Sequence, residues 1–253
     1  MMKMEKIIIK NYEEPELKDP IFIGGLPGIG NVGKITADYF IDKLKMKKMA
    51  DIYSEYLPPQ VFINNSIIHL VRDSLYYMKT NKKNDLIFLS GDFQGTTQEG
   101  QYELSYKTLE LLKKYNISRI YTLGGYSIGK IAEKPKVLGA VSDKKIIQTL
   151  EKAGVTFPNG EPSGGIVGSA GLLLGMGKEL FNIDGACLMG ETSGYFADPK
   201  GAREIINILI KILKIKIDLK DIDEKTKQLE EITEKMKEET KNKSSKEDLN
   251  YFG

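Results

Sequence analysis

Short, uninterrupted apolar runs recur along this chain and are separated by longer stretches whose apolar residues have helical spacing. The runs predicted to be strands are residues 21–24, 61–63, 67–71, 86–90, 119–123 and 186–189. Continuous apolar runs of this length are typical of strands that are covered on both faces. The more alternating stretch 74–79 favours an edge or hairpin strand.

Capping signals predict helices between these strands. The predicted helix starts are Asn31, the T-x-x-E capping box of Thr96 and Glu99, Ser142 or Asp143, and the pair Asp198-Pro199. The corresponding ends lie near Leu44, Asn116, Gly154 and Lys216. Alternation of strands and helices predicts an α/β fold with a largely parallel sheet covered on both faces. The short strands between residues 51 and 79 indicate an antiparallel or bent portion as well.

The composition of the chain changes after residue 217, which divides it into three predicted parts. Residues 1–217 form the α/β core domain. Residues 218–237 keep apolar residues at a spacing of three to four and predict a C-terminal amphipathic helix. Residues 238–253 are almost free of apolar side chains until the end, which predicts a flexible tail. Because the tail nevertheless finishes with Tyr251, Phe252 and Gly253, its aromatic end is a candidate recognition motif.

Composition excludes several classes of function. One cysteine, Cys187, and one histidine, His69, rule out an intramolecular disulfide, a cysteine-built zinc site and a multi-histidine metal site. A net charge of +2 gives no support for nucleic-acid binding. Apolar stretches are too short to span a membrane and the N-terminus does not resemble a signal peptide. We therefore expect a cytoplasmic protein without metal or cofactor, in which His69 and Cys187 are sheet or core residues.

A glycine-rich segment follows the first long apolar strand. Gly28, Gly30 and Gly33 form G-x-G-x-x-G between a predicted strand and a predicted helix, the context of a dinucleotide-binding loop. These glycines are candidates for binding an anion or nucleotide, with Asp51 or Glu55 as the acidic partner of a ribose. The alternative is a glycine-rich turn that lets the helix pack tightly on the sheet. Both interpretations remain open from sequence.

Two further motifs are incomplete. Gly28, Gly33 and Lys34 nearly match a P-loop, but Ile35 stands where a hydroxyl must bind magnesium, and Thr36 comes one position late. Gly125, Ser127 and Gly129 match the G-x-S-x-G of a nucleophile elbow, yet no histidine follows Ser127. A Ser-His-Asp triad in the hydrolase order is therefore absent. The sequence does not supply a complete catalytic set.

The glycine clusters taken in order resemble the proteasome assembly chaperone 2 family, and within it the archaeal members. The segments that carry the resemblance are 25–33, 58–59, 90–94, 122–125, 164–174, 191–194 and 198–202. The resemblance covers roughly residues 20–216. It implies a three-layer α/β sandwich similar to nucleoside phosphorylases, no enzymatic activity and no cofactor. It also implies a homo-oligomer that engages the 20S proteasome core particle, with a paralogous chaperone as a possible further partner.

Archaeal relatives carry a C-terminal tail that ends in a hydrophobic residue, tyrosine and any residue, and that inserts between α-subunits of the core particle. In this chain Tyr251 falls on the hydrophobic position, Phe252 on the tyrosine position and Gly253 on the last. Phe252 departs from the pattern by one hydroxyl. The resemblance implies that the Gly253 carboxylate pairs with a lysine of the pocket. The predicted function is thus an assembly chaperone or ATP-independent activator; the alternative is a nucleotide- or nucleoside-binding protein with phosphorylase-like chemistry that uses Gly28–Gly33.

Overall fold

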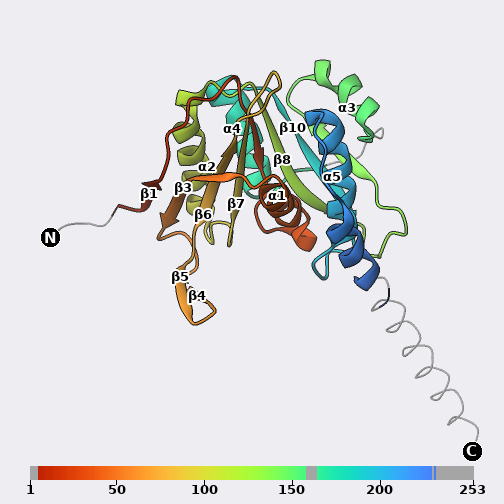
Figure 1. The fold of residues 1–253 in the computed structure, drawn as a ribbon, viewed down its shortest axis with the longest axis horizontal. Coiled ribbons are helices and arrows are strands. Elements are labelled where there is room, and N and C mark those ends of the chain that lie inside the picture. The colour runs from red at the N-terminus through yellow and green to blue at the C-terminus, as the bar shows by residue number, and fades with distance from the viewer. Residues whose placement is uncertain (1–4, 158–163, 230, 232–253) are drawn as a thin grey trace, which may run out of the picture.

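A central sheet of eight strands organises the chain (Figure 1). The computed structural model describes residues 5–157, 164–229 and 231. In spatial order the strands are β1 (Ile7–Asn11), β3 (Lys47–Ser54), β6 (Asp73–Met78), β7 (Leu86–Gly91), β2 (Ile21–Gly24), β8 (Arg119–Ser127), β10 (Gly185–Thr192) and β9 (Val137–Val141). Apolar runs predicted most of these strands, whereas β1, β3 and β9 were not predicted as defined strands.

The sheet is mixed: its centre is parallel, as predicted, and the antiparallel portion predicted between residues 51 and 79 is joined by further antiparallel strands at both edges. Strands β7, β2, β8 and β10 run parallel to one another at its centre. On one side β6, β3 and β1 continue the sheet in antiparallel order, and on the other β9 pairs antiparallel with β10. Both edges are therefore antiparallel additions to a four-stranded parallel core.

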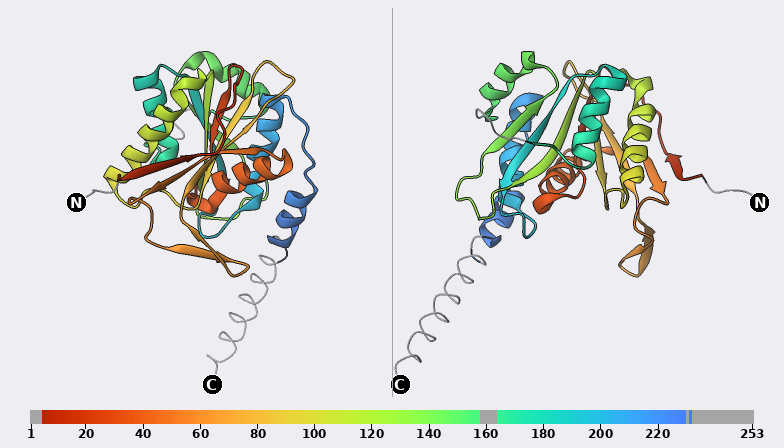
Figure 2. Two further views of the ribbon diagram at one scale, coloured as in Figure 1. Left: turned by 60° about the vertical axis from the view of Figure 1, so that its left-hand side comes forward. Right: turned by 180° about the vertical axis from the view of Figure 1, so that it is seen from behind.

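Helices cover both faces of the sheet, so the architecture has three layers (Figure 2). Helices α1 (Val32–Lys43), α3 (Ile147–Ala153) and α5 (Pro199–Leu213) share one apolar cluster with side chains from the central strands. Helices α2 (Gln98–Leu112) and α4 (Ser169–Phe181) cover the other face. Short 3-10 turns, η1 (Ile29–Asn31), η2 (Lys113–Tyr115) and η3 (Lys144–Ile146), adjoin α1, α2 and α3.

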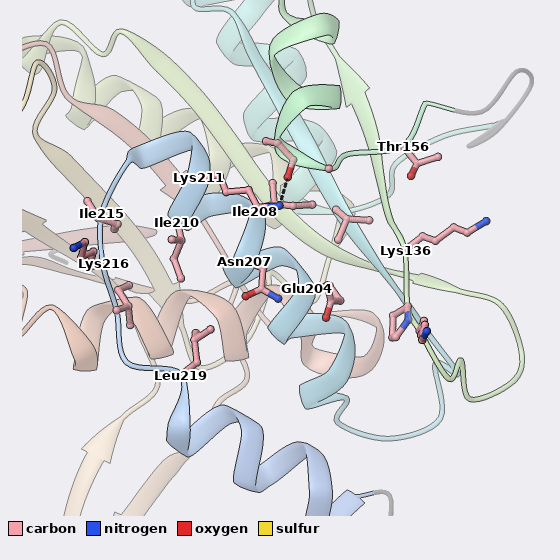
Figure 3. Close-up of a pocket in the computed structure, with 16 residues that line it drawn as sticks. Lys136, Thr156, Glu204, Asn207, Ile208, Ile210, Lys211, Ile215, Lys216 and Leu219 are labelled. Carbon is pink, nitrogen blue, oxygen red and sulfur yellow. Dashed lines mark hydrogen bonds between the residues drawn. The ribbon is translucent and has the colours of Figure 1, made fainter.

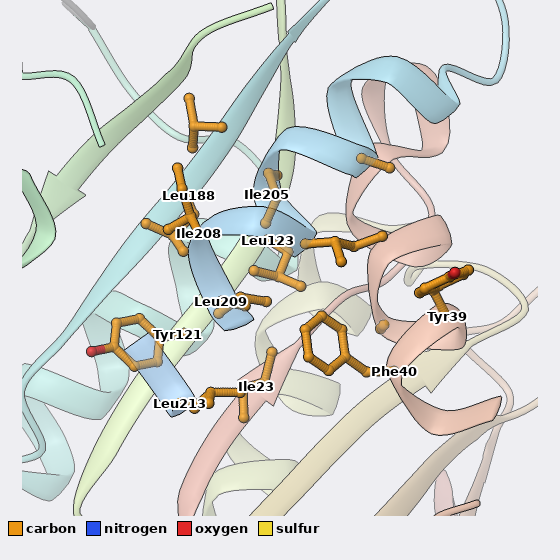
Figure 4. Close-up of a cluster of buried hydrophobic side chains, with 14 of the residues drawn as sticks. Ile23, Tyr39, Phe40, Tyr121, Leu123, Leu188, Ile205, Ile208, Leu209 and Leu213 are labelled. Carbon is orange, nitrogen blue, oxygen red and sulfur yellow. The ribbon is translucent and has the colours of Figure 1, made fainter. Parts of the chain in front are cut away.

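The larger core lies between the sheet and the layer formed by α1, α3 and α5 (Figure 4). Phe40 of α1 stacks on Phe88 of β7, with ring centroids 5.3 Å apart. Ile205 and Leu209 of α5 are fully buried beside them. Because successive strand residues face opposite sides of a sheet, Phe88 contributes to this core while Ile87 and Leu89 contribute to the core under α2 and α4.

Most of the predicted helix boundaries hold, among them Asn31 and Leu44 at the two ends of α1, and the start of α2 shifts by one residue. Asp198 caps α5 with its carboxylate, which accepts hydrogen bonds from the Lys200 and Gly201 amides at 2.9 and 3.1 Å. Gly154 ends α3 with a φ of 111°. The cap of α2 is Thr97 rather than Thr96, since the Thr97 hydroxyl accepts from the Gly100 amide at 3.0 Å. Glu99 does not close a capping box, because its carboxylate binds Lys6 and Tyr56.

Strands β4 (Val61–Asn64) and β5 (Ile67–Leu70) form a separate two-stranded hairpin that stands away from the body (Figures 1 and 2). The expectation that these apolar runs are covered on both faces is wrong for this pair, because nearly all their side chains are exposed. His69 lies on β5 and is half-buried, in a sheet but outside the core. Cys187, on β10, is fully buried as predicted.

Residues 215–229 return along the outside of α1 and α5 after the main fold is complete. Residues 220–229 are helical, and Ile222 within them is fully buried in the α1–α5 core. The Tyr39 hydroxyl donates to the Asp218 carbonyl oxygen at 2.6 Å, and Asp221 and Asp223 pair with Lys43 and Arg203. This segment is thereby fixed to the body. Within the described part of the chain, no helix combines the length and apolarity that crossing a membrane requires.

Candidate functional site

The carboxyl ends of the four parallel strands meet at one end of the sheet and are rich in glycine. These ends are Gly24, Gly91, Ser127 and Thr192. In open α/β sheets, ligands bind in the crevice outside the carboxyl ends of the strands. The three glycines singled out by sequence all lie at this end: Gly28 and Gly30 are between β2 and α1, and Gly33 is in the first turn of α1.

The loop from Gly28 to Asn31 has a tight backbone conformation. Gly30 and Asn31 both have positive φ, at 61° and 49°, which is easily adopted by glycine and tolerated by asparagine. The Asn31 amide donates to the Gly28 carbonyl oxygen at 2.9 Å, and the Asp198 amide donates to the Gly30 carbonyl oxygen at 2.8 Å. The loop is therefore tied to the start of α5 as well as to α1.

The three glycines have different surroundings. A Cβ at Gly33 would lie 2.4 Å from the Leu123 carbonyl oxygen, and one at Gly30 would lie 2.6 Å from the Thr192 hydroxyl. At these two positions glycine permits close packing of the loop and of α1 on the sheet, as the alternative from sequence proposed. Gly28 is different: the nearest atom to a Cβ there is the Gln94 amide nitrogen at 3.5 Å. Gly28 therefore has room for a Cβ, and it lines an open space beside the strand ends.

That space is a cavity of about 710 Å³ beside the strand ends. Its walls are mainly apolar, with contributions from Leu123, Ile166, Leu174 and Met189. Gln94, which also lines the cavity, links two of the surrounding segments: its side-chain nitrogen donates to the Pro27 carbonyl oxygen at 2.6 Å, and its side-chain oxygen accepts from the Ser169 amide at 2.9 Å. Sequence analysis did not single out Gln94; a polar residue just after the carboxyl end of β7 was the available signal.

Two of the polar side chains that line the cavity, Lys178 and Ser127, have protein partners. Lys178 pairs with Asp184 at 2.7 Å. The Ser127 hydroxyl donates to the Ser193 carbonyl oxygen at 3.1 Å, and Ser127 belongs to β8 itself rather than to a sharp turn. Burial raises the pKa of the Cys187 thiol to about 11, so that the thiol is protonated at neutral pH. Neither Ser127 nor Cys187 is arranged as an activated nucleophile.

The remaining candidate residues do not contribute to a phosphate-binding loop, a ribose contact or a catalytic triad. Lys34 pairs with Asp38 along α1 at 3.0 Å, and the Thr36 hydroxyl donates to the Val32 carbonyl oxygen inside the helix. Asp51 lies on β3, which β6 and β7 separate from β2, so it is not beside the glycine loop. His69 is on the hairpin. Among the described residues, no cluster of three or more histidine, cysteine or acidic side chains is placed to hold a metal ion.

Two buried aspartates at the antiparallel side of the sheet have opposite electrostatics. Asp73 is buried over Gly91, and one carboxyl oxygen has no hydrogen-bond partner. Burial, helped by the nearby Asp92, raises the pKa of Asp73 well above its usual value. Burial also acts to raise the pKa of Asp51, but hydrogen bonds from Lys48, Ser74 and Tyr12 outweigh it and lower that pKa.

A second hollow of about 940 Å³ lies between α5, α3 and residues 215–219 (Figure 3). Aliphatic side chains such as Ile208 and Leu219 form its walls, and the Lys211 amine closes one side by donating to the Ala153 carbonyl oxygen at 3.0 Å. It lies where the C-terminal segment crosses the body and does not include the glycine loop.

Comparison with known families places this fold. A family model described as the PAC2 family matches residues 22–237. The chain belongs to the PAC2 family. The match confirms the resemblance that the glycine clusters indicated, and it extends beyond the core domain into the C-terminal helical segment.

Relatives of this PAC2 family member include both uncharacterized and structurally defined proteins. It is 35% identical over 229 residues to an uncharacterized protein of Methanocaldococcus jannaschii, which covers 90% of this chain and 87% of that protein. Its structure is similar to that of Pyrococcus furiosus PbaB, an archaeal proteasome activator, with a TM-score of 0.87, 39% identity, and coverage of 92% and 100%. It is also similar to Pyrococcus furiosus PbaA, an archaeal homolog of proteasome-assembly chaperone, with a TM-score of 0.76, 25% identity and 98% coverage of both chains.

The predicted recognition residues Tyr251, Phe252 and Gly253 lie outside the described residues. Their role therefore stays a prediction, as does that of Gly28 toward an anion or nucleotide.

Proposed function

We propose that this PAC2 family member is a non-enzymatic, cytoplasmic partner of the 20S proteasome core particle, acting as an assembly chaperone or as an ATP-independent activator. The observation that carries the proposal is the similarity to the proteasome activator PbaB, which extends over the whole of that chain. Similarity to PbaA supports the same partner through a second relative.

In this proposal the C-terminal residues bind pockets between α-subunits of the core particle. Tyr251 occupies the hydrophobic position and Phe252 the tyrosine position, with Gly253 last. An aromatic ring that fills a pocket contributes about 2 kcal/mol, so one tail binds weakly. A homo-oligomer presents several tails together, and their effective concentration strengthens the interaction without new contacts.

The anchoring of residues 215–229 supports this use of the tail. The contacts of Asp218, Asp221 and Asp223 with α1 and α5 fix the segment that precedes the tail to the body. The chain is therefore held on the body up to residue 229. Placement from a fixed origin reduces the volume that a tethered motif must search, which favours simultaneous binding of several tails.

The test is co-purification of core particle with the full chain, with Phe252→Ala and with a truncation after residue 248. We expect full binding by the natural chain, a strong reduction for Phe252→Ala and loss for the truncation. Tyr102→Ala is the matched control, because Tyr102 is an exposed aromatic on α2, far from the tail in sequence. Equal binding by all four proteins would refute the tail contact.

Two further variants separate the parts of the motif. Phe252→Tyr restores the hydroxyl of the family pattern and should hold or strengthen binding. One residue added after Gly253 tests whether a carboxylate at that position takes part, and we expect weaker binding. Binding that survives both the truncation and the addition would place the contact elsewhere on the body.

The nucleotide-binding alternative receives less support from the site. The cavity beside Gly28 has a suitable volume, but its one lysine, Lys178, is already paired with Asp184. A thermal-shift titration with inorganic phosphate, a purine nucleoside and ATP tests this alternative directly. A saturable increase in melting temperature that Gly28→Val removes would revive it.

A further inference from the structure

A third, smaller apolar cluster lies apart from the two main cores and surrounds the cavity beside the strand ends. Cys187 and Met189 of β10 belong to it, together with Leu174 of α4, and all three line the cavity. Ile166, from the segment before α4, packs against the cluster. Cys187 and Met189 are two positions apart on one strand, so both side chains lie on the face of the sheet that α4 covers. The cavity therefore lies between α4 and this face of β10.

A glycine inside strand β8 widens the cavity on the side of the sheet. Gly124 lines the cavity and is opposite Met189 in an unbroken parallel register with β10. Its φ is not in the left-handed region, and the nearest atom to a Cβ there would be Met189 Cγ at 4.0 Å. Its neighbour Gly125 differs, because a Cβ there would lie 2.2 Å from the Ile29 carbonyl oxygen. Glycine in a strand interior weakens the strand and often marks a place where a ligand approaches closely.

A second glycine lines the same cavity from the helix side. Gly175 lies in the interior of α4, where glycine is less favourable than alanine, and a Cβ there would meet no atom within 4 Å. Other glycines of this helix pack closely: a Cβ at Gly171 would lie 2.1 Å from the Ile166 carbonyl oxygen, and one at Gly177 would lie 2.4 Å from Ile120 Cδ1. Two glycines that no close contact in the described chain explains, one in a strand and one in a helix, therefore border one empty volume.

The chemistry of the walls restricts what can fill this volume. The charged side chains that line it, Lys178 and Glu179, have opposite signs; Lys178 is paired with Asp184, and Glu179 is exposed to solvent. An ionic ligand would lose hydration without gaining a buried counter-charge. The Met189 thioether, in contrast, is polarizable and makes favourable contacts with aromatic rings, and the Cys187 thiol is buried beside it. These walls favour an uncharged aromatic ligand.

We propose that this cavity is a binding site for a small, uncharged aromatic molecule, which lies against Gly124 of the sheet and contacts Met189 and Leu174. The volume of about 710 Å³ is that of a pocket for a small organic molecule. Such a ligand fills the space that the two glycines leave open and removes apolar surface of β10 and α4 from water. The proposal does not rest on the contact with core particle, because it involves neither the tail nor an assembly. It also differs from the nucleotide alternative, which requires a site for phosphate.

The first experiment is a fluorescence titration of the full chain with two dyes that share one ring system. Phenylnaphthylamine is uncharged, whereas anilinonaphthalene sulfonate carries the same aromatic rings and a negative charge. We expect saturable binding of the uncharged dye and about tenfold weaker binding of the sulfonate, because the cavity has no unpaired cation for it. Absence of saturable binding by the uncharged dye, or equal affinity for the two dyes, would overturn the proposal.

Variants that fill the cavity show whether the dye binds there. Gly124→Val places a branched side chain opposite Met189, and Gly175→Leu fills the space from α4 with a residue that helices favour. We expect each variant to bind the uncharged dye about tenfold more weakly, because the new side chain occupies volume that the rings need. Glu103→Leu is the matched control, since it adds leucine at an exposed position of α2 that does not line the cavity. Unchanged affinity in both filled variants would place the dye on another apolar surface, such as the hairpin, and would overturn the proposal.

A milder variant separates a ligand site from a structural glycine. Gly124→Ala should keep or raise the melting temperature of the free chain, because a methyl group fits the space and glycine weakens a strand. The same variant should reduce the rise in melting temperature that the uncharged dye produces in the natural chain. A lower melting temperature for free Gly124→Ala would show that packing requires this glycine, and the proposal would fail.

Methyl signals in nuclear magnetic resonance spectra of the natural chain report the position of the dye directly. Met189 lines the cavity, whereas Met49 is buried in the core beneath α2. We expect the uncharged dye to shift the Met189 methyl signal and to leave the Met49 signal in place. An unshifted Met189 signal at saturating dye would overturn the proposal.

Discussion

Strand β7 and the β4–β5 hairpin have nearly the same sequence pattern and opposite surroundings. Leu86–Gly91 and the two hairpin strands are all dominated by isoleucine, leucine, valine and phenylalanine, although His69 interrupts the run in β5. Every residue of β7 is buried, whereas every residue of β4 is exposed. The same sequence pattern predicts burial for both regions, and within this chain only β7 is buried.

The difference lies in what the topology places beside each strand. β7 lies between β6 and β2, with α1 on one face and α2 and α4 on the other. The hairpin follows β3 and precedes β6, and it leaves the sheet at the end where β3 finishes and β6 begins. An apolar run therefore indicates that a surface requires covering, and it does not specify that the cover comes from the same chain.

The strongest test of this contrast is truncation of one side chain in each region. Phe88→Ala should lower the free energy of unfolding by about 3–5 kcal/mol, because it removes a fully buried ring and leaves a cavity. Ile68→Ala should change the free energy of unfolding of the single chain by less than about 0.5 kcal/mol. Urea denaturation at low protein concentration measures both. A comparable loss for the two variants would show that the hairpin is packed within the chain.

A smaller effect separates two glycines of one loop. Gly33→Ala should cost about 1–3 kcal/mol, because the added Cβ would lie 2.4 Å from the Leu123 carbonyl oxygen and force α1 off the sheet. Gly28→Ala should change stability by less than about 0.5 kcal/mol, since the added Cβ would make only an ordinary van der Waals contact, 3.5 Å from the Gln94 amide nitrogen. Thermal denaturation of the two variants side by side provides the comparison. Equal melting temperatures would mean that the packing role assigned to Gly33 is wrong.

The buried aspartates Asp73 and Asp51 should make the stability of the fold depend on pH in opposite directions. The pKa of Asp73 in the folded chain lies well above its unfolded value of about 3.9. Unfolding therefore releases a proton, and stability falls as pH rises from that unfolded value through the folded pKa. Asp73→Asn should raise the melting temperature at pH 8 and make progressively less difference toward pH 4. A gain that is independent of pH would contradict this assignment.

Asp51→Asn is the control with the opposite sign. Because the folded-state pKa of Asp51 is lowered, its carboxylate contributes stability above the unfolded pKa and loses it as pH falls through the folded value. The variant should therefore melt below the natural chain at pH 8, and the gap should narrow under acid conditions.

The smallest expected effect is confined to the hairpin turn. Asn65 and Ser66 both have positive φ, at 48° and 64°, as the two central residues of a type I′ turn do. Ser66→Gly relieves the steric cost of this conformation and should stabilise the hairpin by less than about 1 kcal/mol. Amide hydrogen exchange should slow in β4 and β5 while the rates in β7 stay the same. Unchanged exchange in the hairpin would show that the turn is not strained.

Much of the framework was determined by local sequence. Asp198-Pro199 caps α5 because an aspartate before proline satisfies the first helix amides whatever lies around it. Gly154 ends α3 because the left-handed conformation there suits glycine. The apolar runs of β2, β7, β8 and β10 predicted the buried centre of the sheet, and the ordered glycine clusters indicated the family that the comparisons confirmed.

Tertiary structure alone decided the remaining features, since they depend on residues far apart in the chain. Strand order separates Asp51 from the glycine loop by two strands, which no local pattern encodes. The roles of Gly28 and Gly33 diverge because a Cβ at Gly33 would lie 2.4 Å from the Leu123 carbonyl oxygen of β8, whereas the nearest atom to a Cβ at Gly28 is 3.5 Å away. Gln94 joins Pro27 to the start of α4 across 67 and 75 positions. The hairpin stays exposed because the eight-stranded sheet forms without it. The hydrophobic effect is non-directional, so an apolar sequence cannot specify which surface will cover it.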